Sequence, residues 1–578
     1  MGIPGLFKNC IQKYNNLFDN KIIQTFMRET ITKLQNESTV TSPVKNRLYL
    51  DFNCAVYYAL KPEMKSEEVL ITHTLAYLDT LCKLVPNLDL LYIALDGVPP
   101  RAKMEQQRAR RFHSVCKKRK ATTINTKYGD HVDKTNYNFH LDTNMITPGT
   151  EFMTKLSESM RNHISTNEYY DDKKVIFSDA YIPGEGEHKL LKYIRENPAD
   201  DDINTIIYGL DGDLIMLSLV SREKNLYLLR EAAQYGGFAK EHEGHKYLFL
   251  NIDNLKEGLM EEFQLKMAFD IDKSNTDKYI DDYIFLCFTL GNDFVPKMHW
   301  YSLYEGGHEK LLSTYFTIHN FTEEFLVDRD SDYINRIMLM DIFKELAYDE
   351  GSAMKRCIKN RSRQKPPVKD DMSERERQQL LIDFYPLQYL DIEKNIDPFS
   401  NGWNGRYYNV CFRFNRTQKN VEMVTNAYLK TLVWNFHYYF TGCNDWEHYY
   451  PYDYSPTAND ICDTLNAIKP TNLCKNYKFS NNSAIEPQTL LLMVLPLNSS
   501  NCMATDIHKK LNGRDTDMDI YFPKKYTLNV AFHRYYYECS ANIPKFESRT
   551  VSNFMKKIKL TDDEVERNKT SELYTKNV

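Results

Sequence analysis

The sequence lacks the cysteine patterns of a zinc finger and of a disulfide-bonded scaffold. Its 12 cysteines are scattered over 578 residues, with no CxxC pair and no Cys/His cluster at zinc-finger spacing. Scattered free thiols are typical of proteins in reducing compartments. We therefore expect a cytoplasmic protein, with the nucleus as the alternative location.

Long apolar runs and a secretion signal are also missing. The run LLLMVLPL at 490–497 is far shorter than the ~18 apolar residues of a membrane span. The N-terminal sequence MGIPGLFKNC lacks the apolar core of a signal peptide, and Leu6 stands where a myristoylation motif has Ser or Thr. These absences predict a soluble intracellular protein that does not bind a membrane.

The chain has no excess of positive charge. Its 74 Lys and Arg are outnumbered by 79 Asp and Glu, which gives a formal net charge of −5. This balance argues against a generic basic coat on nucleic acid. It leaves room for a nuclease, because an acidic metal site can offset a local basic stripe.

The sequence does contain several short apolar runs that end in acids. The run RLYLD ends at Asp51, and LLYIALD ends at Asp96. The run TIIYGL is followed at once by Asp211 and Asp213. An apolar run that ends in a carboxylate predicts a buried parallel strand with a charge at its carboxyl end. We therefore predict an α/β fold with a mostly parallel central sheet flanked by helices.

Further acids are expected to join these strand ends. A glutamate pair follows a Pro-Gly turn in DAYIPGEGEHK, and another aspartate follows the apolar segment DDYIFLCFTLGN. Ligands of open α/β sheets bind beyond the carboxyl ends of the strands, and crowded carboxylates need a cation to neutralise them. Oxygen ligands favour Mg²⁺ or Mn²⁺, so we predict a catalytic centre for two metal ions. Its predicted ligands are Asp51, Asp96, Glu185, Glu187, Asp211, Asp213 and Asp293. Taken singly, each acid has an alternative role as a turn residue or a helix cap.

A basic segment follows the second of these predicted strands. Residues 101–120 predict a helix with nine Lys and Arg, and the polar residues 121–140 predict a loop. One face of this helix combines two guanidinium groups, an ammonium and an amide, which suits a phosphate pocket. Its members are Lys103, Gln107, Arg110 and Arg111. The alternative is a solvated basic surface. The run KKRK at 117–120 suits a nuclear localisation patch or surface charge, and we favour surface charge.

The composition changes in the middle of the chain. Residues 355–380 are polar, highly charged and broken by two prolines, which predicts a linker. It divides a nuclease domain at 1–354 from a second region at 381–578. The second region is rich in aromatic residues, and we expect it to be mainly helical and packed on the first. The terminal residues 560–578 predict a polar tail.

Five segments together resemble the eukaryotic 5′→3′ exoribonucleases of the Xrn1/Rat1 type. They are DGVPPRAKMEQQRARRF, ITPGTEFM, SDAYIPGEGEHKLLKYIRE, YGLDGDLIMLSL and CFTLGNDFVP. Looser similarity continues beyond residue 381, in WNFHYYFTG, YYPYDYSP and LTDDEVERN. The resemblance covers essentially the whole chain, and it leaves no room for the additional C-terminal domains of the large cytoplasmic enzymes.

This resemblance implies a fold, an activity and a set of partners. The fold is related to PIN and flap-nuclease domains, and two divalent metals support stepwise release of 5′-mononucleotides. The seven acids become metal ligands with Asp282 as a supporting group, and the basic face at 103–111 becomes the site for a 5′-monophosphate. The expected substrate is single-stranded RNA with a 5′-monophosphate, because a capped end is too large. We expect a monomer, with the decapping machinery as a candidate partner.

The sequence departs from the family at the aromatic residues that grip the first base. Where the family has a stacking His, this chain has Tyr57, and a Tyr ring stacks equally well. The resemblance suggests Trp446 as the second ring, with interdomain packing as the alternative role. Two residues later, His448 stands where the family commonly has a Trp.

Two other functions share part of this pattern. A flap-type DNA nuclease has the same acidic site and a similar MGI-GL start, but the QQRARRF helix favours a closed pocket for a 5′-phosphate. A catalytically inactive RNA-binding scaffold would not need all seven acids, and all seven are present. The sequence therefore favours a processive 5′→3′ exoribonuclease.

Overall fold

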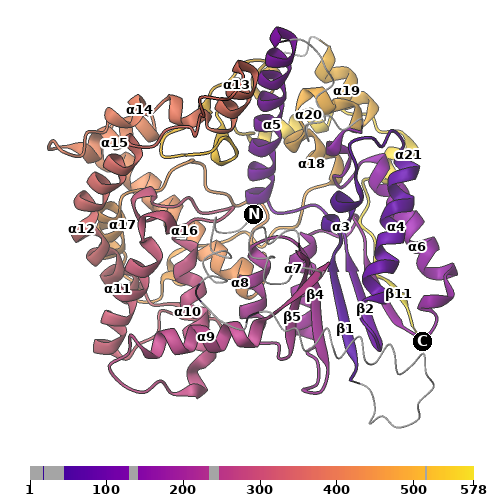
Figure 1. The fold of residues 1–578 in the computed structure, drawn as a ribbon, viewed down its shortest axis with the longest axis horizontal. Coiled ribbons are helices and arrows are strands. Elements are labelled where there is room, and N and C mark those ends of the chain that lie inside the picture. The colour runs from indigo at the N-terminus through magenta and orange to yellow at the C-terminus, as the bar shows by residue number, and fades with distance from the viewer. Residues whose placement is uncertain are drawn as a thin grey trace.

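The computed structural model describes residues 13, 17, 44–128, 141–232, 246–513 and 517–577. A central sheet of seven strands organises the N-terminal half, in the order β11-β3-β2-β1-β4-β5-β6 (Figure 1). The five inner strands run parallel, while the two edge strands pair antiparallel with their neighbours. The strands are β1 (Asn46–Asp51), β2 (Leu88–Ala94), β3 (Lys174–Ser178), β4 (Asn204–Tyr208), β5 (Leu226–Glu231), β6 (Tyr247–Asn251) and β11 (Tyr574–Lys576).

Both faces of this sheet are covered, which explains its nearly continuous apolar strands. Alternate residues of β1 enter different cores: Tyr49 packs in one, and Leu48 and Leu50 pack in the other. The core of Leu48 is closed by α4 and α6, and the core of Tyr49 by α7, α8 and α9 (Figure 1). The helices of this half are α3 (Phe52–Ala59), α4 (Glu67–Lys83), α5 (Arg101–Tyr128), α6 (Glu151–Thr166), α7 (Gly186–Glu196), α8 (Asp213–Val220) and α9 (Ile252–Gln264).

The second half of the chain is mainly helical and shares a core with the first. Buried aromatic residues such as Trp300, Trp434 and Tyr439 belong to the same cluster as Tyr49. The larger helices of this half are α10 (Thr276–Phe288), α11 (Gly307–Thr322), α12 (Arg336–Ser362), α16 (Gln418–Phe440) and α17 (Ala458–Ala467). The predicted fold class, an α/β sheet with an aromatic-rich helical region packed on it, is confirmed.

The remaining elements are short. Figure 1 shows α5 rising away from the sheet, with α13 on one side and α18 on the other, and both contact it. The short helices are α13 (Glu374–Asp383), α14 (Asp391–Lys394), α15 (Trp403–Cys411), α18 (Pro487–Val494), α19 (Thr505–Asn512), α20 (Ser548–Met555) and α21 (Asp562–Glu566). Two small hairpins pair β7 (Val327–Asp328) with β8 (Tyr333–Ile334), and β9 (Leu528–Asn529) with β10 (Ser540–Ala541).

Two local predictions need correction. The loop predicted at 121–140 begins too early, because α5 continues to Tyr128; residues 129–140 lie outside the described residues. Contact with α13 supports this extra length, and Arg375 of α13 donates to Asn125 Oδ1 at 3.3 Å. The polar tail is also wrong in part, because Tyr574–Lys576 forms β11 on the edge of the sheet.

The predicted linker contains regular structure at both ends. Helix α12 runs to Ser362 and α13 begins at Glu374, so an irregular segment remains between them. The division of the chain at 355–380 stays a prediction. Among the described helices, none combines the length and the apolar character that crossing a membrane requires.

Candidate active site

The predicted acids lie where helices and strands end around one edge of the sheet. Asp51 is the last residue of β1, and Asp96 and Asp211 follow β2 and β4. Because β2, β1 and β4 are parallel neighbours, their carboxyl ends lie side by side. Glu185 occupies the N-cap position of α7 without a capping hydrogen bond from its side chain, and Glu187 lies in the first turn.

The last two acids come from different parts of the chain. Asp213 is the first residue of α8, and Asp293 lies in the loop after α10. The second half of the chain therefore supplies one acid to a cluster whose other members come from the first half.

The acids of β1, β2, β4 and α7 lie close enough together to repel one another. Burial, with the charges of Asp96 and Asp211, raises the pKa of Asp51 well above its usual range. Burial and the charge of Asp211 likewise raise the pKa of Glu187. Burial and the charge of Asp293 raise the pKa of Asp213 to about 7. The seven predicted acids are thus brought into one acidic cluster, which is buried except at Asp96 and Asp211, where it is half-buried.

Polar neighbours hold two of these carboxylates in place. Asn53 donates from Nδ2 to Asp96 Oδ2 at 2.8 Å, and its Oδ1 accepts from the backbone N–H of Asp96 at 3.1 Å. The thiol of Cys54 donates to Asp51 Oδ2 at 3.2 Å. Both side chains lie in the first turn of α3, directly after β1. The turn after the strand therefore fixes the orientation of both acids.

Glycine at position 186 allows α7 to approach the strand ends. A Cβ atom there would lie 2.5 Å from Asp51 Oδ1 and 3.3 Å from the carbonyl oxygen of Ala94, both too close. Its backbone N–H donates to Asp96 Oδ1 at 2.7 Å. The GEGEH turn thus brings the start of α7, with its two glutamates, against Asp51 and Asp96.

The ammonium group of Lys103 lies inside the acidic cluster. Its Nζ is 2.6 Å from Glu185 Oε2 and 3.0 Å from Asp293 Oδ2, and all three side chains are buried. Burial alone would raise the pKa of Asp293, but the charges of Lys103 and Arg110 lower it to about 2. Lys103 therefore balances part of the acidic charge from the first turn of α5.

A column of aromatic rings lies behind Glu185. Tyr438 on α16 donates from its hydroxyl to Glu185 Oε1 at 2.7 Å. Its ring stacks on Trp434, with centroids 4.8 Å apart, and on His188, with centroids 3.8 Å apart. The aromatic-rich region thus positions one of the acids from the second half of the chain.

Two carboxylate oxygens of the cluster have no partner in the described part of the chain. Glu187 Oε2 and Asp213 Oδ1 are buried and accept no hydrogen bond. A buried anionic oxygen without a donor costs free energy, and a divalent cation would satisfy both atoms and reduce the repulsion. The residues present therefore fit hard divalent cations such as Mg²⁺ or Mn²⁺.

The basic face of α5 leads away from this cluster. Arg110 is exposed, and its charge lowers the pKa of both Asp211 and Asp293, so it lies near them. Arg111 donates from Nη2 to Thr147 Oγ1 at 2.9 Å, while its Nη1 is buried without a partner among the described residues. The side chain of Gln107, between Lys103 and these arginines, is half-buried. The Nη1 group of Arg111 is therefore available for an anion.

The two predicted stacking rings lie on different elements. Tyr57 on α3 is 45% exposed. Partial burial raises the pKa of its hydroxyl, and the nearby charges of Arg111 and Arg110 offset part of this rise. Trp446 is half-buried, and its carbonyl oxygen accepts from the first N–H of α5 at 2.7 Å. No ring contact joins these two described residues, and their pairing across a base stays a prediction. The Nε2 atom of His448 is hydrogen-bonded to Thr431 Oγ1 at 3.0 Å, so the His448 ring packs against α16.

A cavity of ≈ 560 Å³ lies beside the cluster, between α5, the loop after α10 and the segments at 449–453 and 533–545. Asp293 and Arg110 lie on its wall, together with Lys297, Tyr449 and Lys545. The other six predicted acids do not line it. Acidic side chains, including Glu105 and Asp453, also line it, so the cavity has a mixed charge next to the cluster.

Asp282 has a different role from the acidic cluster. Its carboxylate accepts from the backbone N–H groups of Leu326 and Val327, at 2.8 and 2.7 Å, and from the Tyr315 hydroxyl at 2.6 Å. These bonds tie β7 and α11 to α10. Asp282 therefore supports the fold around α10 rather than any ligand.

Sequence reasoning missed Asn53, Cys54 and Tyr438. Asn53 and Cys54 follow Asp51 directly, and that proximity to a strand-end acid is the signal that could have revealed them. Tyr438 lies within the aromatic run WNFHYYFTG, where its sequence position does not distinguish it from its neighbours.

Comparison with known protein families connects this geometry to a function. A family model described as "XRN 5'-3' exonuclease N-terminus" matches residues 1–232. A second, described as "Xrn1 helical domain", matches residues 273–388 and 386–575. Six of the seven acids lie in the first match, while Asp293, Tyr438 and Trp446 lie in the second.

Similar curated proteins carry matching names. The "5'-3' exoribonuclease 2" of Arabidopsis thaliana is 27% identical and aligns with 98% of this chain and 68% of its own length. The protein of the same name from Gallus gallus is 26% identical, over 98% of this chain and 71% of its own length. The "5'-3' exoribonuclease 1" of Homo sapiens is 27% identical, over 92% of this chain but 34% of its own length.

Proposed function

The chain belongs to the XRN 5′-3′ exonuclease family, and we propose that it is a processive 5′→3′ exoribonuclease that degrades 5′-monophosphorylated RNA to mononucleotides. One observation carries this proposal: the buried acidic cluster lies directly beside the basic face of α5. Divalent metal use follows from the family, and the two unpartnered carboxylate oxygens support a bound cation. We propose two ions, Mg²⁺ or Mn²⁺, because seven clustered acids provide enough oxygen ligands for both.

In this proposal the acids hold the metals and the chain positions the substrate. Bound divalent ions would supply an activated water and stabilise the leaving 3′-oxygen. Asn53 and Gly186 orient Asp96, and Tyr438 orients Glu185, through the hydrogen bonds described above. Lys103 limits the repulsion between Glu185 and Asp293, and its charge would also favour an anionic substrate beside them.

The basic face of α5 gives the reaction its direction. A 5′-terminal monophosphate carries more negative charge than an internal phosphodiester, and Arg110 and Arg111 with Gln107 can bind that extra charge. Each cut leaves a new 5′-monophosphate on the remaining RNA. The product of one step is therefore the ligand for the next, which accounts for processivity without a separate clamp. Arriving RNA would come from enzymes that remove the 5′ cap.

The proposal predicts a strict order of substrates. With Mg²⁺, we expect the full chain to convert 5′-monophosphorylated single-stranded RNA to 5′-mononucleotides, and to leave capped RNA and 5′ DNA flaps intact. The measurement is product analysis on the three substrates at equal concentration. Cleavage of the DNA flap in preference to RNA would favour the flap-nuclease alternative, and tight RNA binding without any cleavage would favour an inactive scaffold.

A second prediction concerns the stacking rings. If Tyr57 and Trp446 grip the first base, each replacement by Ala should cost about 1–3 kcal/mol of RNA binding free energy, the usual value of base–aromatic stacking. Tyr57→Phe serves as the matched control, because it retains the ring and removes only the hydroxyl. RNA affinity measured by fluorescence anisotropy is the readout. Wild-type affinity in Tyr57→Ala would remove Tyr57 from the site.

A further inference from the structure

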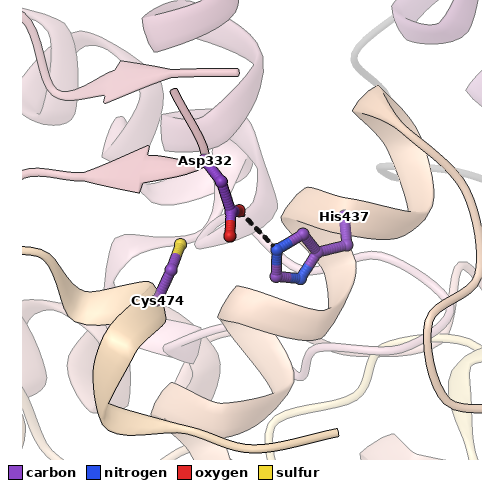
Figure 2. Close-up of side chains that lie close together, drawn as sticks. All are labelled: Asp332, His437 and Cys474. Carbon is purple, nitrogen blue, oxygen red and sulfur yellow. Dashed lines mark hydrogen bonds and ion pairs between the residues drawn. The ribbon is translucent and has the colours of Figure 1, made fainter. Parts of the chain in front are cut away.

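Three potential metal ligands that do not belong to the acidic cluster meet at another place in the structure (Figure 2). Asp332 precedes β8, His437 lies in the last turn of α16, and Cys474 lies in the 3₁₀ turn Leu473–Asn476. Their ligand atoms lie within 4.8 Å of one another. The side chains point toward one another in Figure 2, and His437 Nε2 is 2.6 Å from Asp332 Oδ1.

We propose that Asp332, His437 and Cys474 form a zinc-binding site. Thiolate sulfur, imidazole nitrogen and carboxylate oxygen are the three donor types that Zn²⁺ uses, whereas Mg²⁺ and Mn²⁺ prefer oxygen alone. The donor set therefore selects a different metal from that of the acidic cluster. Its ligands come from three separate segments, so no zinc-type spacing appears in the sequence.

The ligands are held in place by a shared neighbour. Asn472 donates from Nδ2 to the carbonyl oxygen of Asp332 at 2.9 Å. Its Oδ1 accepts from the backbone N–H of Cys474 at 3.0 Å and from that of Ile334 at 3.2 Å. One amide side chain thus fixes the backbone at two of the three ligands. The site is pre-organised before any ion binds.

The third ligand has the neighbour expected of a metal-bound histidine. The second ring nitrogen of such a histidine donates a hydrogen bond to a neighbouring group, and this bond sets the tautomer. Here Asn444 lies 2.8 Å from His437 Nδ1. The Oδ1 atom of Asn444 is buried with no partner in the described part of the chain. The atom of Asn444 that faces this nitrogen is Nδ2. If the amide turns so that Oδ1 accepts from Nδ1–H instead, Nε2 presents its lone pair toward Asp332 and Cys474.

Binding requires only small movements. The donors of a tetrahedral zinc ion lie about 3.3–3.6 Å apart, given Zn–N and Zn–O near 2.0 Å and Zn–S near 2.3 Å. Asp332 is 63% exposed at its side chain, so it can rotate, and solvent can supply a fourth ligand. When the ion binds, the Cys474 thiol loses its proton to solvent and the thiolate–zinc bond forms.

The site would fix the end of α16. His437 is followed directly by Tyr438, the residue that donates to Glu185 in the acidic cluster. Zinc would join this turn to the β7–β8 hairpin and to the turn at Cys474. The ion therefore has a structural role, and the full chain should bind it independently of RNA.

Cobalt provides the test, because a thiolate ligand gives Co²⁺ a charge-transfer band in the near ultraviolet that carboxylates do not give. The full chain is stripped with a chelator, placed in excess Mg²⁺ to fill the acidic cluster, and titrated with Co²⁺. We expect one ion per chain with this band, and displacement of the cobalt by Zn²⁺. Cys474→Ser should lose the band, whereas the control Cys462→Ser on α17 should keep it.

Two further variants keep the test independent of any folding defect in Cys474→Ser. Asp332→Asn changes an exposed side chain at φ 50°, a conformation that Asn adopts readily, and Asn444→Ala removes the partner of His437. Loss of a hydrogen-bond partner of a metal ligand weakens metal binding by about 10–100-fold. We therefore expect Asn444→Ala to weaken Zn²⁺ binding by that factor, and Asp332→Asn, which changes a ligand itself, to weaken it at least as much. Absence of the band in the wild type, an unchanged band in Cys474→Ser, or unchanged Zn²⁺ affinity in Asp332→Asn would each overturn the site.

Discussion

In the double variant Asp211→Ala and Asp213→Ala, we expect RNA hydrolysis to fall by about a thousand-fold or more while RNA binding persists. The metals contribute several kcal/mol of transition-state stabilisation, and each ~1.4 kcal/mol corresponds to a tenfold change in rate. Binding persists because Arg110 and Arg111 remain in place. The measurements are the single-turnover cleavage rate and the RNA affinity of the same preparations, each with and without EDTA.

A matched control lies at the other end of the same strand. Asp200→Ala with Asp202→Ala removes two acids at the same spacing, but both are exposed before β4 begins. This variant should cleave RNA at the wild-type rate. Full turnover of the wild type in excess EDTA, or near-normal hydrolysis by the Asp211/Asp213 variant, would falsify the metal assignment.

The stability of the variants separates a lost metal site from a damaged fold. In the wild type without metal, Asp213 and its neighbours repel one another in a buried position, as the raised pKa of Asp213 indicates. The pKa of Asp211, in contrast, is lowered by nearby positive charges, so its charged form stabilises the fold. Because the two effects oppose each other, removing both acids should leave the thermal midpoint of the metal-free protein close to that of the wild type. Adding Mg²⁺ should raise the midpoint of the wild type but not that of the variant, because an ion that binds only the folded state stabilises it.

The strand-end acids could be predicted because their signal is local. An apolar run fixes a buried strand, and the acid that ends it, such as Asp51 or Asp96, must lie at the edge of the sheet. The parallel order of β2, β1 and β4 then brings the acids together. The signal of Glu185 and Glu187 is local as well, because both stand in the short turn sequence PGEGE.

Contacts between distant segments could not be predicted in this way. Helical spacing grouped Lys103 with Arg110, but it did not show that the Lys103 ammonium lies between Glu185 and Asp293. Tyr438 reaches Glu185 from α16 through the packing of one half of the chain on the other. The pairing of β11 with β3 is equally non-local, because a short polar segment gains its strand conformation from the sheet edge that it covers.

Neutralising Arg110 and Arg111 together should reduce the preference for 5′-phosphorylated RNA over 5′-hydroxyl RNA. A hydrogen bond to a charged group contributes about 1.5–3 kcal/mol, so the ratio of the two cleavage rates should fall roughly tenfold to hundredfold. The variant is Arg110→Gln with Arg111→Gln, and the measurement is this ratio in wild type and variant. Lys103 is left unchanged, because its ammonium balances the acidic cluster and its loss would also alter the metals.

The control for this prediction lies on the same helix. Lys118→Gln with Arg119→Gln removes an adjacent pair of exposed positive charges about 12 Å further along α5, at a rise of 1.5 Å per residue. A general electrostatic effect would lower both rates in both variants and leave the ratio unchanged. A pocket for the 5′-phosphate would change the ratio only in the Arg110/Arg111 variant, because only that pair lies beside Asp293 and carries the unpartnered Nη1 group. An unchanged ratio there would mean that α5 presents a solvated surface, and the origin of the 5′→3′ direction would have to lie elsewhere in the site.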